Sequence, residues 1–140
     1  MESSTPKPRR KQSGLIPIRH NIGKLEVLLV TSMTRKRWII PKGNIEAELG
    51  PRETARLEAY EEAGVEGKVT DDPIGTYIHE NGKGPRSVEV YVMEVERVLP
   101  DDEWPESRFR KRQWMDIDQA RRLILEADLG ELLGKLAREL

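Results

Sequence analysis

The 140-residue sequence contains no cysteine, which excludes disulfide bonds and thiolate metal sites and is compatible with a reducing compartment. It also lacks any apolar run near the roughly 20 residues that a membrane-spanning helix needs, so we expect no membrane partner. The basic N-terminus is not followed by the apolar stretch of a secretory signal. These absences predict a cytoplasmic protein.

An excess of charge of one sign is missing too, because 24 Lys and Arg residues nearly balance 25 Asp and Glu residues. The net charge therefore indicates neither a membrane surface nor a specific nucleic-acid partner, and any electrostatic attraction must be local. Aromatic residues are few, with one Phe and three Tyr besides three Trp that are expected to be packing residues, which leaves few candidates for stacking on a nucleobase. Nothing in the sequence isolates an oligomeric interface, so the oligomeric state stays open.

The length and the 36% hydrophobic content are sufficient for one core, which predicts a single domain over residues 14–140. Residues 1–13 are rich in Ser, Pro, Lys and Arg and predict a flexible tail. Branched aliphatic runs predict strands at 14–20, 25–32 and 37–40. Alternating residues on both sides of the sequence NGKG predict a β-hairpin within residues 69–98.

A further helix is predicted between Pro51 and Ala63. Pro51 suits the first turn, where its missing N–H costs no hydrogen bond, and Gly64 suits a left-handed C-terminal cap. The residues between them are mostly good helix formers. Alanines four residues apart, at 55, 59 and 63, form a stripe that could pack against a sheet.

Three glutamates, Glu58, Glu61 and Glu62, crowd the C-terminal end of this helix. Their spacing of three and four residues places the carboxylates on one side, where they repel one another by a few tenths of a kcal/mol per pair. The helix dipole also disfavours anions at this end. A bound divalent cation would compensate, and oxygen ligands favour Mg²⁺ or Mn²⁺ over zinc. The alternative is a solvated acidic face paired with nearby Lys or Arg.

The surrounding stretch, GNIEAELGPRETARLEAYEEAGV at residues 43–65, resembles the signature of the Nudix hydrolase family. That signature is a glycine, five residues, Glu, seven residues, Arg-Glu, an apolar residue, any residue, Glu-Glu, any residue, Gly and an apolar residue. The positions that match are Gly43, Glu58, Ala59, Glu61, Glu62, Gly64 and Val65.

Two positions depart from the signature, since Leu49 replaces its first Glu and Leu57 replaces its Arg. In the family that arginine braces the catalytic glutamates. Arg56 lies one place early and is turned by roughly 100° around the helix from the required direction. The missing carboxylate could come from Glu46, Glu48 or Glu53.

The resemblance extends to RWIIPKGN before the signature and RKRQWMDIDQARRLI after it, so that it covers roughly residues 14 to 135. It implies the family's fold, an α/β class α/β/α sandwich with a mixed central sheet, the Glu-rich helix on one side and C-terminal helices over 116–127 and 129–140 covering other surfaces. It also implies metal-dependent hydrolysis of a diphosphate linked to another group, with Glu58, Glu61 and Glu62 holding Mg²⁺ or Mn²⁺ and serving as the catalytic residues. Glu61 and Glu62 are the candidates for the general base. Gly43 would let its backbone approach the metal or phosphate.

Substrate recognition is expected from Arg35, Arg37 and Lys42, which flank the strand before the signature. Strand alternation would send both arginines to one face and Lys36 to the other. Two arginines on one face suit a substrate with several phosphates. The alternative is an ordinary basic strand end. A second basic cluster at residues 108–112 is expected to be solvated surface.

The flanking sequence is most similar to the Nudix subgroup of diphosphoinositol polyphosphate and diadenosine polyphosphate phosphohydrolases. We therefore expect a phosphorylated small-molecule substrate of one of these kinds. His79 is expected to be a structural or surface residue, and Trp38 a core residue rather than a platform for base stacking. Because Leu49 and Leu57 replace charged residues, an alternative is a catalytically inactive Nudix-fold module that binds a phosphorylated ligand.

Overall fold

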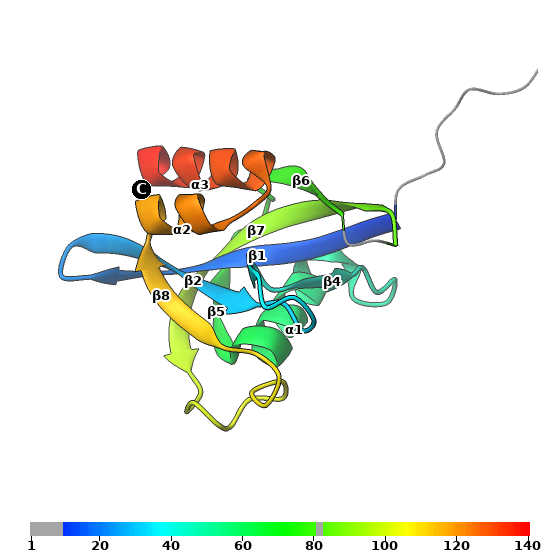
Figure 1. Cartoon of the computed structure of the whole chain (residues 1–140), viewed down its shortest axis with the longest axis horizontal. Coiled ribbons are helices and arrows are strands. Elements are labelled where there is room, and N and C mark those ends of the chain that lie inside the picture. The colour runs from blue at the N-terminus through cyan, green and yellow to red at the C-terminus, as the bar shows by residue number, and fades with distance from the viewer. Residues whose placement is uncertain (1–9, 81–82) are drawn as a thin grey trace, which may run out of the picture.

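The structure is a computed structural model that describes residues 10–80 and 83–140, and over these residues the chain forms a sheet flanked by helices (Figure 1). The strands are β1 (Arg10–Asn21), β2 (Lys24–Thr31), β3 (Trp38–Ile39), β4 (Lys42–Asn44), β5 (Val65–Val69), β6 (Gly75–Glu80), β7 (Pro85–Val98) and β8 (Arg112–Asp116). The helices are α1 (Gly50–Ala63), α2 (Ile117–Leu123) and α3 (Ala127–Glu139).

The strands form one mixed sheet whose central order is β3-β2-β1-β7-β5. Strand β4 pairs with β1, β6 with β7, and β8 with β2. Only the β1–β7 pair is parallel among the described strands, and the other pairs are antiparallel. The expected mixed central sheet is therefore confirmed.

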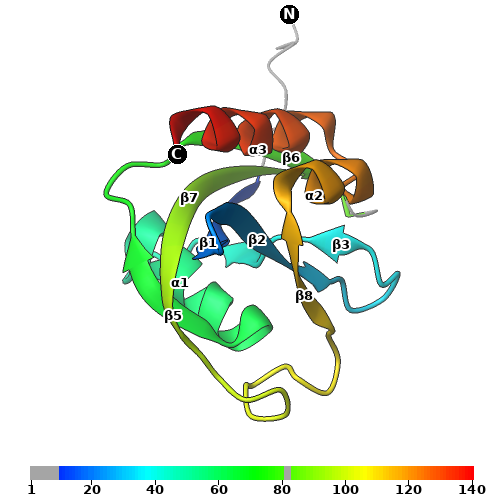
Figure 2. The same ribbon diagram turned by 90° about the vertical axis from the view of Figure 1, so that its left-hand side faces the viewer.

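Helices cover both faces of the sheet: α2 and α3 lie on one side, and α1 lies on the other (Figures 1 and 2). Successive residues of each central strand alternate between two apolar clusters, as the period of two of a strand requires. In β2, Val27 and Leu29 pack in the cluster beneath α2 and α3, whereas Leu28 and Val30 pack in the cluster beneath α1. The expected α/β sandwich is confirmed.

Helix α1 follows the prediction closely. It runs from Gly50 to Ala63, and Gly64 ends it in the left-handed conformation, with φ of 66° and its N–H bonded to the Tyr60 carbonyl. The alanine stripe is buried against the sheet, since Ala55, Ala59 and Ala63 are completely inaccessible to solvent. Small side chains let this helix approach the strands closely, which brings its glutamates to the sheet edge at β4.

Other boundaries differ from the prediction. Strand β1 begins at Arg10, so residues 10–13 belong to the sheet rather than to the expected tail, because β7 offers them a parallel partner. Residues 1–9, the rest of the expected tail, lie outside the described residues. The strand expected at 37–40 is reduced to Trp38–Ile39, and the short strands β4 and β5 were not predicted.

The predicted hairpin is confirmed as the antiparallel pair of β6 and β7, with Glu80 opposite Pro85. The first part of its turn, residues 81–82, lies outside the described residues. The two predicted C-terminal helices correspond to α2, which is shorter than expected, and to α3, which begins two residues earlier and ends one residue earlier than expected. In the described part of the chain, none of the helices has the length and apolar character needed to cross a membrane.

Candidate active site

Glu58 and Glu62 lie one turn apart on α1 and face strand β4. Glu62 is buried, with 7% of its surface exposed, and its Oε1 accepts a hydrogen bond of 3.1 Å from the backbone N–H of Lys42. Glu58 lies against Gly43, where a Cβ atom would stand 2.6 Å from its Oε2 and 2.7 Å from its Oε1. A glycine is therefore needed at position 43 for the carboxylate to approach the β4 backbone.

The two carboxylates are strongly coupled. Burial, the hydrogen bond with Glu62 and neighbouring negative charges raise the pKa of Glu58 to about 8. Burial also raises the pKa of Glu62, although Arg110 and two hydrogen bonds oppose this. Two acids held this close in a desolvated place cannot both be ionised without a compensating cation. A divalent ion would supply that charge in place of the proton.

A further acidic residue near this pair, Glu106, was missed by the sequence reasoning. It lies in the segment between β7 and β8, and its backbone N–H donates a hydrogen bond of 3.1 Å to the carbonyl of Glu61. Burial is the largest cause of the raised pKa of both Glu58 and Glu62, and the negative charge of Glu106 is a smaller cause. No sequence signal identified it, because it lies more than 40 residues beyond the helix and is brought there only by the fold.

The second basic cluster, at residues 108–112, is not simply solvated surface as predicted. The side chains of Arg110 and Arg112 are only 8% and 9% exposed. Arg110 forms ion pairs with Glu62 and Glu106, at 3.4 and 2.7 Å. Arg112 lies over the Trp104 ring and donates to the carbonyls of Ala63 and Gly64 at the end of α1.

The Lys42 ammonium group is within electrostatic range of the acidic pair and of Glu126, which lines a neighbouring cavity. Burial lowers the pKa of its ammonium group, and the negative charges of Glu62, Glu126 and Glu58 oppose that change. Glu62 and Glu58 belong to α1, whereas Glu126 lines the cavity. The lysine thus connects the two regions electrostatically.

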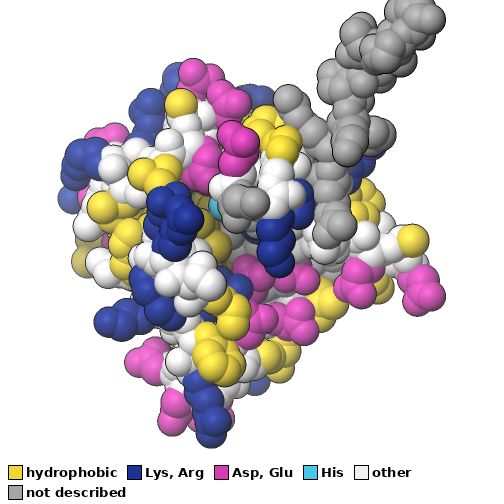
Figure 3. Space-filling model, turned by 45° about the vertical axis from the view of Figure 1, so that its right-hand side comes forward, with side chains coloured by type: hydrophobic (Ala, Val, Ile, Leu, Met, Phe, Trp, Pro, Cys, Tyr) yellow, Lys and Arg dark blue, Asp and Glu magenta, His cyan; other side chains and the backbone are white. Residues whose placement is uncertain are grey.

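The cavity has a volume of about 160 Å³ and is lined by the β2–β3 connection, β6 and the α2–α3 connection. Arg35, Arg37 and Trp38 contribute to one side of it, and His79 and Glu126 to another. Figure 3 shows acidic side chains gathered in the middle of one face of the molecule and bordered by basic ones. Trp38 is half-buried, so it packs against the core as predicted while also reaching the cavity.

The two arginines share the cavity for a reason other than the predicted strand alternation. Residues 35–37 lie in a turn before β3 rather than in a strand. Lys36 adopts a left-handed backbone, with φ of 53°, and its ammonium group donates to the carbonyl of Phe109. This turn leaves Arg35 and Arg37 on the cavity wall.

His79 and Glu126 are joined by a hydrogen bond at the cavity wall, with 2.8 Å between Nδ1 and Oε2. The hydrogen bond from His79 lowers the pKa of the Glu126 carboxyl, against the opposing effect of burial. The histidine therefore anchors the start of α3 to β6, as its expected structural role requires. It also presents an imidazole to the cavity.

Comparison with known proteins agrees with this geometry. The family described as NUDIX domain matches residues 8–136, which is nearly the whole chain. The chain belongs to the Nudix family. Because the match extends over the sheet, α1 and the C-terminal helices, it accounts for the fold and not only for the glutamate-rich stretch.

Individual Nudix relatives are similar over much of the chain. Human diphosphoinositol polyphosphate phosphohydrolase 3-beta is 41% identical over 68% of this chain and 57% of its own length. Nudix hydrolase 13, mitochondrial, of Arabidopsis thaliana is 33% identical over 83% of this chain and 63% of its own length. The chain thus spans less than two thirds of the length of these curated relatives. Among solved structures, the Ap4A hydrolase of C. elegans superposes with a TM-score of 0.74 at 27% identity, covering 94% of this chain and 98% of that one.

The two departures from the Nudix signature lie together. Leu49 and Leu57 line the same surface groove beside Tyr60, away from the Glu58 carboxylate. The two signature positions that carry Glu and Arg in the family are thus both apolar in this chain. Helix α1 still forms and still contacts β4, where Glu62 accepts a hydrogen bond from the backbone N–H of Lys42.

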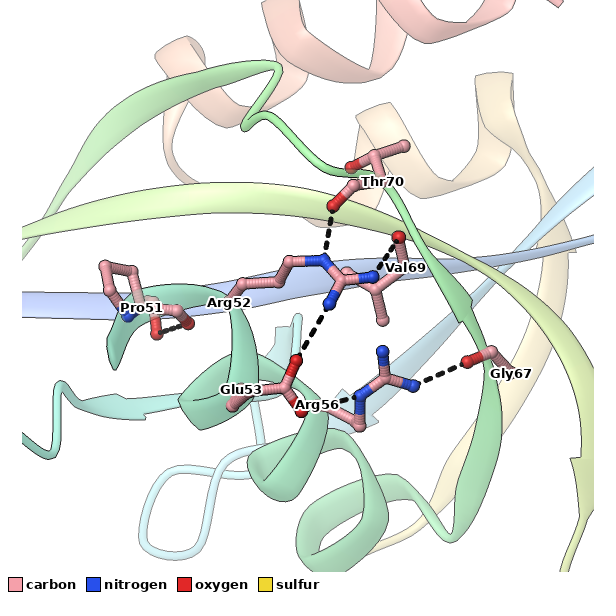
Figure 4. Close-up of polar contacts among 8 residues, drawn as sticks. Pro51, Arg52, Glu53, Arg56, Gly67, Val69 and Thr70 are labelled. Atoms are coloured by element: carbon pink, nitrogen blue, oxygen red, sulfur yellow. Dashed lines mark hydrogen bonds and ion pairs between the residues drawn. The ribbon is translucent and has the colours of Figure 1, made fainter. Parts of the chain in front are cut away.

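Arg56 does not brace the glutamates that were predicted to be catalytic. Figure 4 shows that it donates to the carbonyl of Gly67 and pairs with Glu53, while Arg52 pairs with Glu53 and donates to the carbonyls of Val69 and Thr70. These contacts fasten α1 to β5. Glu53 is therefore committed to two arginines and is not a replacement for the missing signature carboxylate.

Within residues 10–80 and 83–140, no three Asp, Glu or His side chains form a group that could bind a metal ion as they stand. The structure brings Glu58 and Glu62 together. Glu61 lies close enough for its negative charge to raise the pKa of Glu58, in addition to the larger effects of burial and of Glu62. The donor chemistry still fits a divalent cation of the kind that Nudix proteins generally use. Glu58 and Glu62 are adjacent carboxylates that share a hydrogen bond, and Gly43 lets the Glu58 carboxylate lie against β4, so the oxygen atoms here are donors of the kind that Mg²⁺ or Mn²⁺ prefers.

Proposed function

We propose that this chain is a metal-dependent hydrolase that cleaves a diphosphate linkage in a polyphosphorylated small molecule. The observation that carries the proposal is the pair of buried Glu62 and half-buried Glu58, with Glu58 against Gly43, together with a cavity walled by Arg35 and Arg37. The first arrangement suits a cation and the second a polyanion. The relatives named as hydrolases of diphosphoinositol polyphosphates and of Ap4A support the reaction class.

The metal would be Mg²⁺ or Mn²⁺, held by Glu58, Glu61 and Glu62. Such an ion neutralises phosphate oxygens, lowers the pKa of a bound water and stabilises the departing phosphate. The chain's contribution is to keep the carboxylates desolvated and oriented, with the Lys42 N–H fixing one oxygen of Glu62. Glu61 or Glu62 would accept the proton of the attacking water.

Phosphate groups would be bound by Lys42, Arg35 and Arg37, while the backbone at Gly43 allows close approach. The charges of both the glutamate pair and Glu126 at the cavity act on Lys42, so its ammonium group is a candidate to contact a phosphate chain that extends from one to the other. Guanidinium groups bind phosphate in a bidentate manner, which suits the cavity wall for a second phosphate.

The substrate class is a diphosphoinositol polyphosphate or a dinucleoside polyphosphate. Arginine and lysine side chains serve both, since both carry several phosphates. Trp38 reaches the cavity and could stack on a base, which would favour the dinucleotide. The additional phosphates on the ring of a diphosphoinositol polyphosphate would instead bind to Arg35 and Arg37. The place of action we infer is the cytoplasm, although some relatives are named as mitochondrial or chloroplastic.

A second candidate is a module that binds a phosphorylated ligand without hydrolysing it. Leu49 and Leu57, which stand where the signature has charged residues, favour this candidate. The ion pairs of the buried Arg110 side chain with Glu62 and Glu106 argue against this candidate. A module that only binds a ligand does not need carboxylates held in place beside the proposed metal.

Product formation with Mg²⁺ across a panel of substrates separates the two candidates. The panel contains inositol pyrophosphates, dinucleoside polyphosphates and nucleoside diphosphate derivatives, and the variants are Glu61→Gln and Glu62→Gln. Hydrolysis by the wild type that falls in at least one variant supports the enzyme. Tight binding of a panel member with no turnover would establish the binding module instead.

A further inference from the structure

The Arg110 guanidinium makes contacts in three directions. Its Nε lies 2.7 Å from Oε1 of Glu106, and one terminal nitrogen lies 3.4 Å from Oε2 of Glu62. The other terminal nitrogen donates a hydrogen bond of 3.0 Å to the carbonyl of Thr31. The contacts therefore join the β7–β8 segment, α1 and β2 through one side chain that is 8% exposed.

Glu62 is held from both sides as a result. The Lys42 N–H binds its Oε1 and Arg110 pairs with its Oε2, so neither oxygen is free to rotate. Glu106 is fixed in turn, because its side chain pairs with Arg110 and its backbone N–H binds the Glu61 carbonyl. A planar guanidinium sets the distance and angle between two carboxylates in a way that a flexible ammonium group does not.

We propose that Arg110 is a positioning residue that holds Glu62 in the orientation needed to bind the divalent cation, while Glu106 fixes the guanidinium in turn. The inference rests on the metal centre of the proposed function. On α1 itself no arginine is available for this task, because position 57 is Leu and Arg56 is committed to Gly67 and Glu53. The guanidinium is supplied instead by the segment between β7 and β8.

Arg112, two residues further on, is a useful comparison because its contacts are structural. Its guanidinium donates to the main-chain carbonyls of Ala63, Gly64 and Leu99 and stacks on Trp104. The carboxylate that it contacts, Asp101, is fully exposed. Arg112 therefore matches Arg110 in type, burial and neighbourhood but contacts no acidic residue of the site.

The two arginines make a controlled experiment possible. Mn²⁺ binding is measured without substrate, by the electron paramagnetic resonance of free Mn²⁺, for the wild type, Arg110→Gln, Arg110→Lys and Arg112→Lys. Thermal unfolding without metal establishes that each variant is folded. Loss of a partner that orients a metal ligand typically weakens metal binding about 10- to 100-fold, and we expect that loss for Arg110→Gln. Arg110→Lys should recover part of it, and Arg112→Lys should bind Mn²⁺ within about twofold of the wild type.

The outcomes separate the inference from the function on which it rests. Wild-type Mn²⁺ affinity in folded Arg110→Gln and Arg110→Lys would overturn the positioning role while leaving the metal centre in place. An equal loss in Arg112→Lys would also overturn it, because the effect would then come from the stability of the segment. No Mn²⁺ binding by the wild type would overturn the metal centre, and the inference with it.

Discussion

Gly43 in β4 lies so close to Glu58 in α1 that a methyl group on the glycine would stand 2.6 Å from one carboxylate oxygen. The obstructing atoms belong to the end of a flexible side chain, which can turn away. We therefore expect Gly43→Ala to displace the Glu58 carboxylate rather than to unfold the protein. The cost in unfolding free energy should lie near the low end of the roughly 1 to 3 kcal/mol that overpacking causes.

Mn²⁺ binding should weaken at least tenfold in the same variant, about the effect of disturbing a ligand's surroundings. Calorimetric titration with Mn²⁺ and thermal unfolding measure the two quantities. Gly130→Ala, in α3, is the control because nothing lies within 4 Å of the added methyl group. If Gly43→Ala retained full affinity for the ion, Glu58 would not be a ligand in this arrangement.

Arg35 and Arg37 should contribute to substrate binding more than to chemistry, because they line the cavity rather than the acidic pair. Replacing either by Ala removes charge-assisted hydrogen bonds to phosphate and should raise KM about tenfold, with little change in kcat. Steady-state kinetics at two salt concentrations measure this. Arg97→Ala, which removes an exposed arginine paired with Glu66, should change neither constant. Equal kinetics for all three variants would exclude the cavity from the substrate site.

Arg112 should matter for stability. It closes the C-terminal end of α1 through two carbonyls, and its guanidinium lies 3.9 Å from the centre of the Trp104 ring. We expect Arg112→Ala to lower the unfolding free energy by about 2–4 kcal/mol, from lost charged hydrogen bonds and the cation–π contact. Denaturant unfolding measures the loss. A change below about 0.5 kcal/mol would mean that water replaces these contacts at no cost.

The His79–Glu126 pair predicts a pH dependence of stability. The hydrogen bond from His79 lowers the pKa of Glu126 in the folded state below its ordinary value near 4.5. The stabilisation is therefore present above the ordinary pKa and is lost as the pH falls through the lower, folded-state value. Wild type and Glu126→Gln should differ in melting temperature at neutral pH and converge in acid. A difference that grows as the pH falls would contradict this assignment.

The sequence predicted best what depends on neighbours along the chain. Helix α1 has its proline at the start, its glycine at the end and its alanines at regular spacing, so local rules sufficed. The same regularity placed Glu58 and Glu62 on one side of the helix. Strands β4 and β5 escaped prediction because strands of three and five residues have too few positions to show alternation.

The rest of the candidate site depends on contacts between distant segments. Glu106 and Arg110 come to α1 only because the β7–β8 segment returns to the end of that helix. In the sequence they belong to a charged stretch with the pattern of exposed surface. Arg35 and Arg37 were assigned to one face by an alternation that does not exist, and the turn before β3 places them together instead.

The most direct test of the central claim compares Glu58→Gln with Glu53→Gln in Mg²⁺-dependent hydrolysis of the panel substrate that the wild type cleaves fastest. Both residues lie on α1, but Glu53 pairs with Arg52 and Arg56 on the β5 side. We predict that Glu58→Gln lowers kcat/KM more than about tenfold and raises the Mg²⁺ requirement, since a ligand matters at least as much as its partners. Glu53→Gln should remain close to the wild type. Full activity and an unchanged Mg²⁺ requirement in Glu58→Gln would contradict the proposed metal centre.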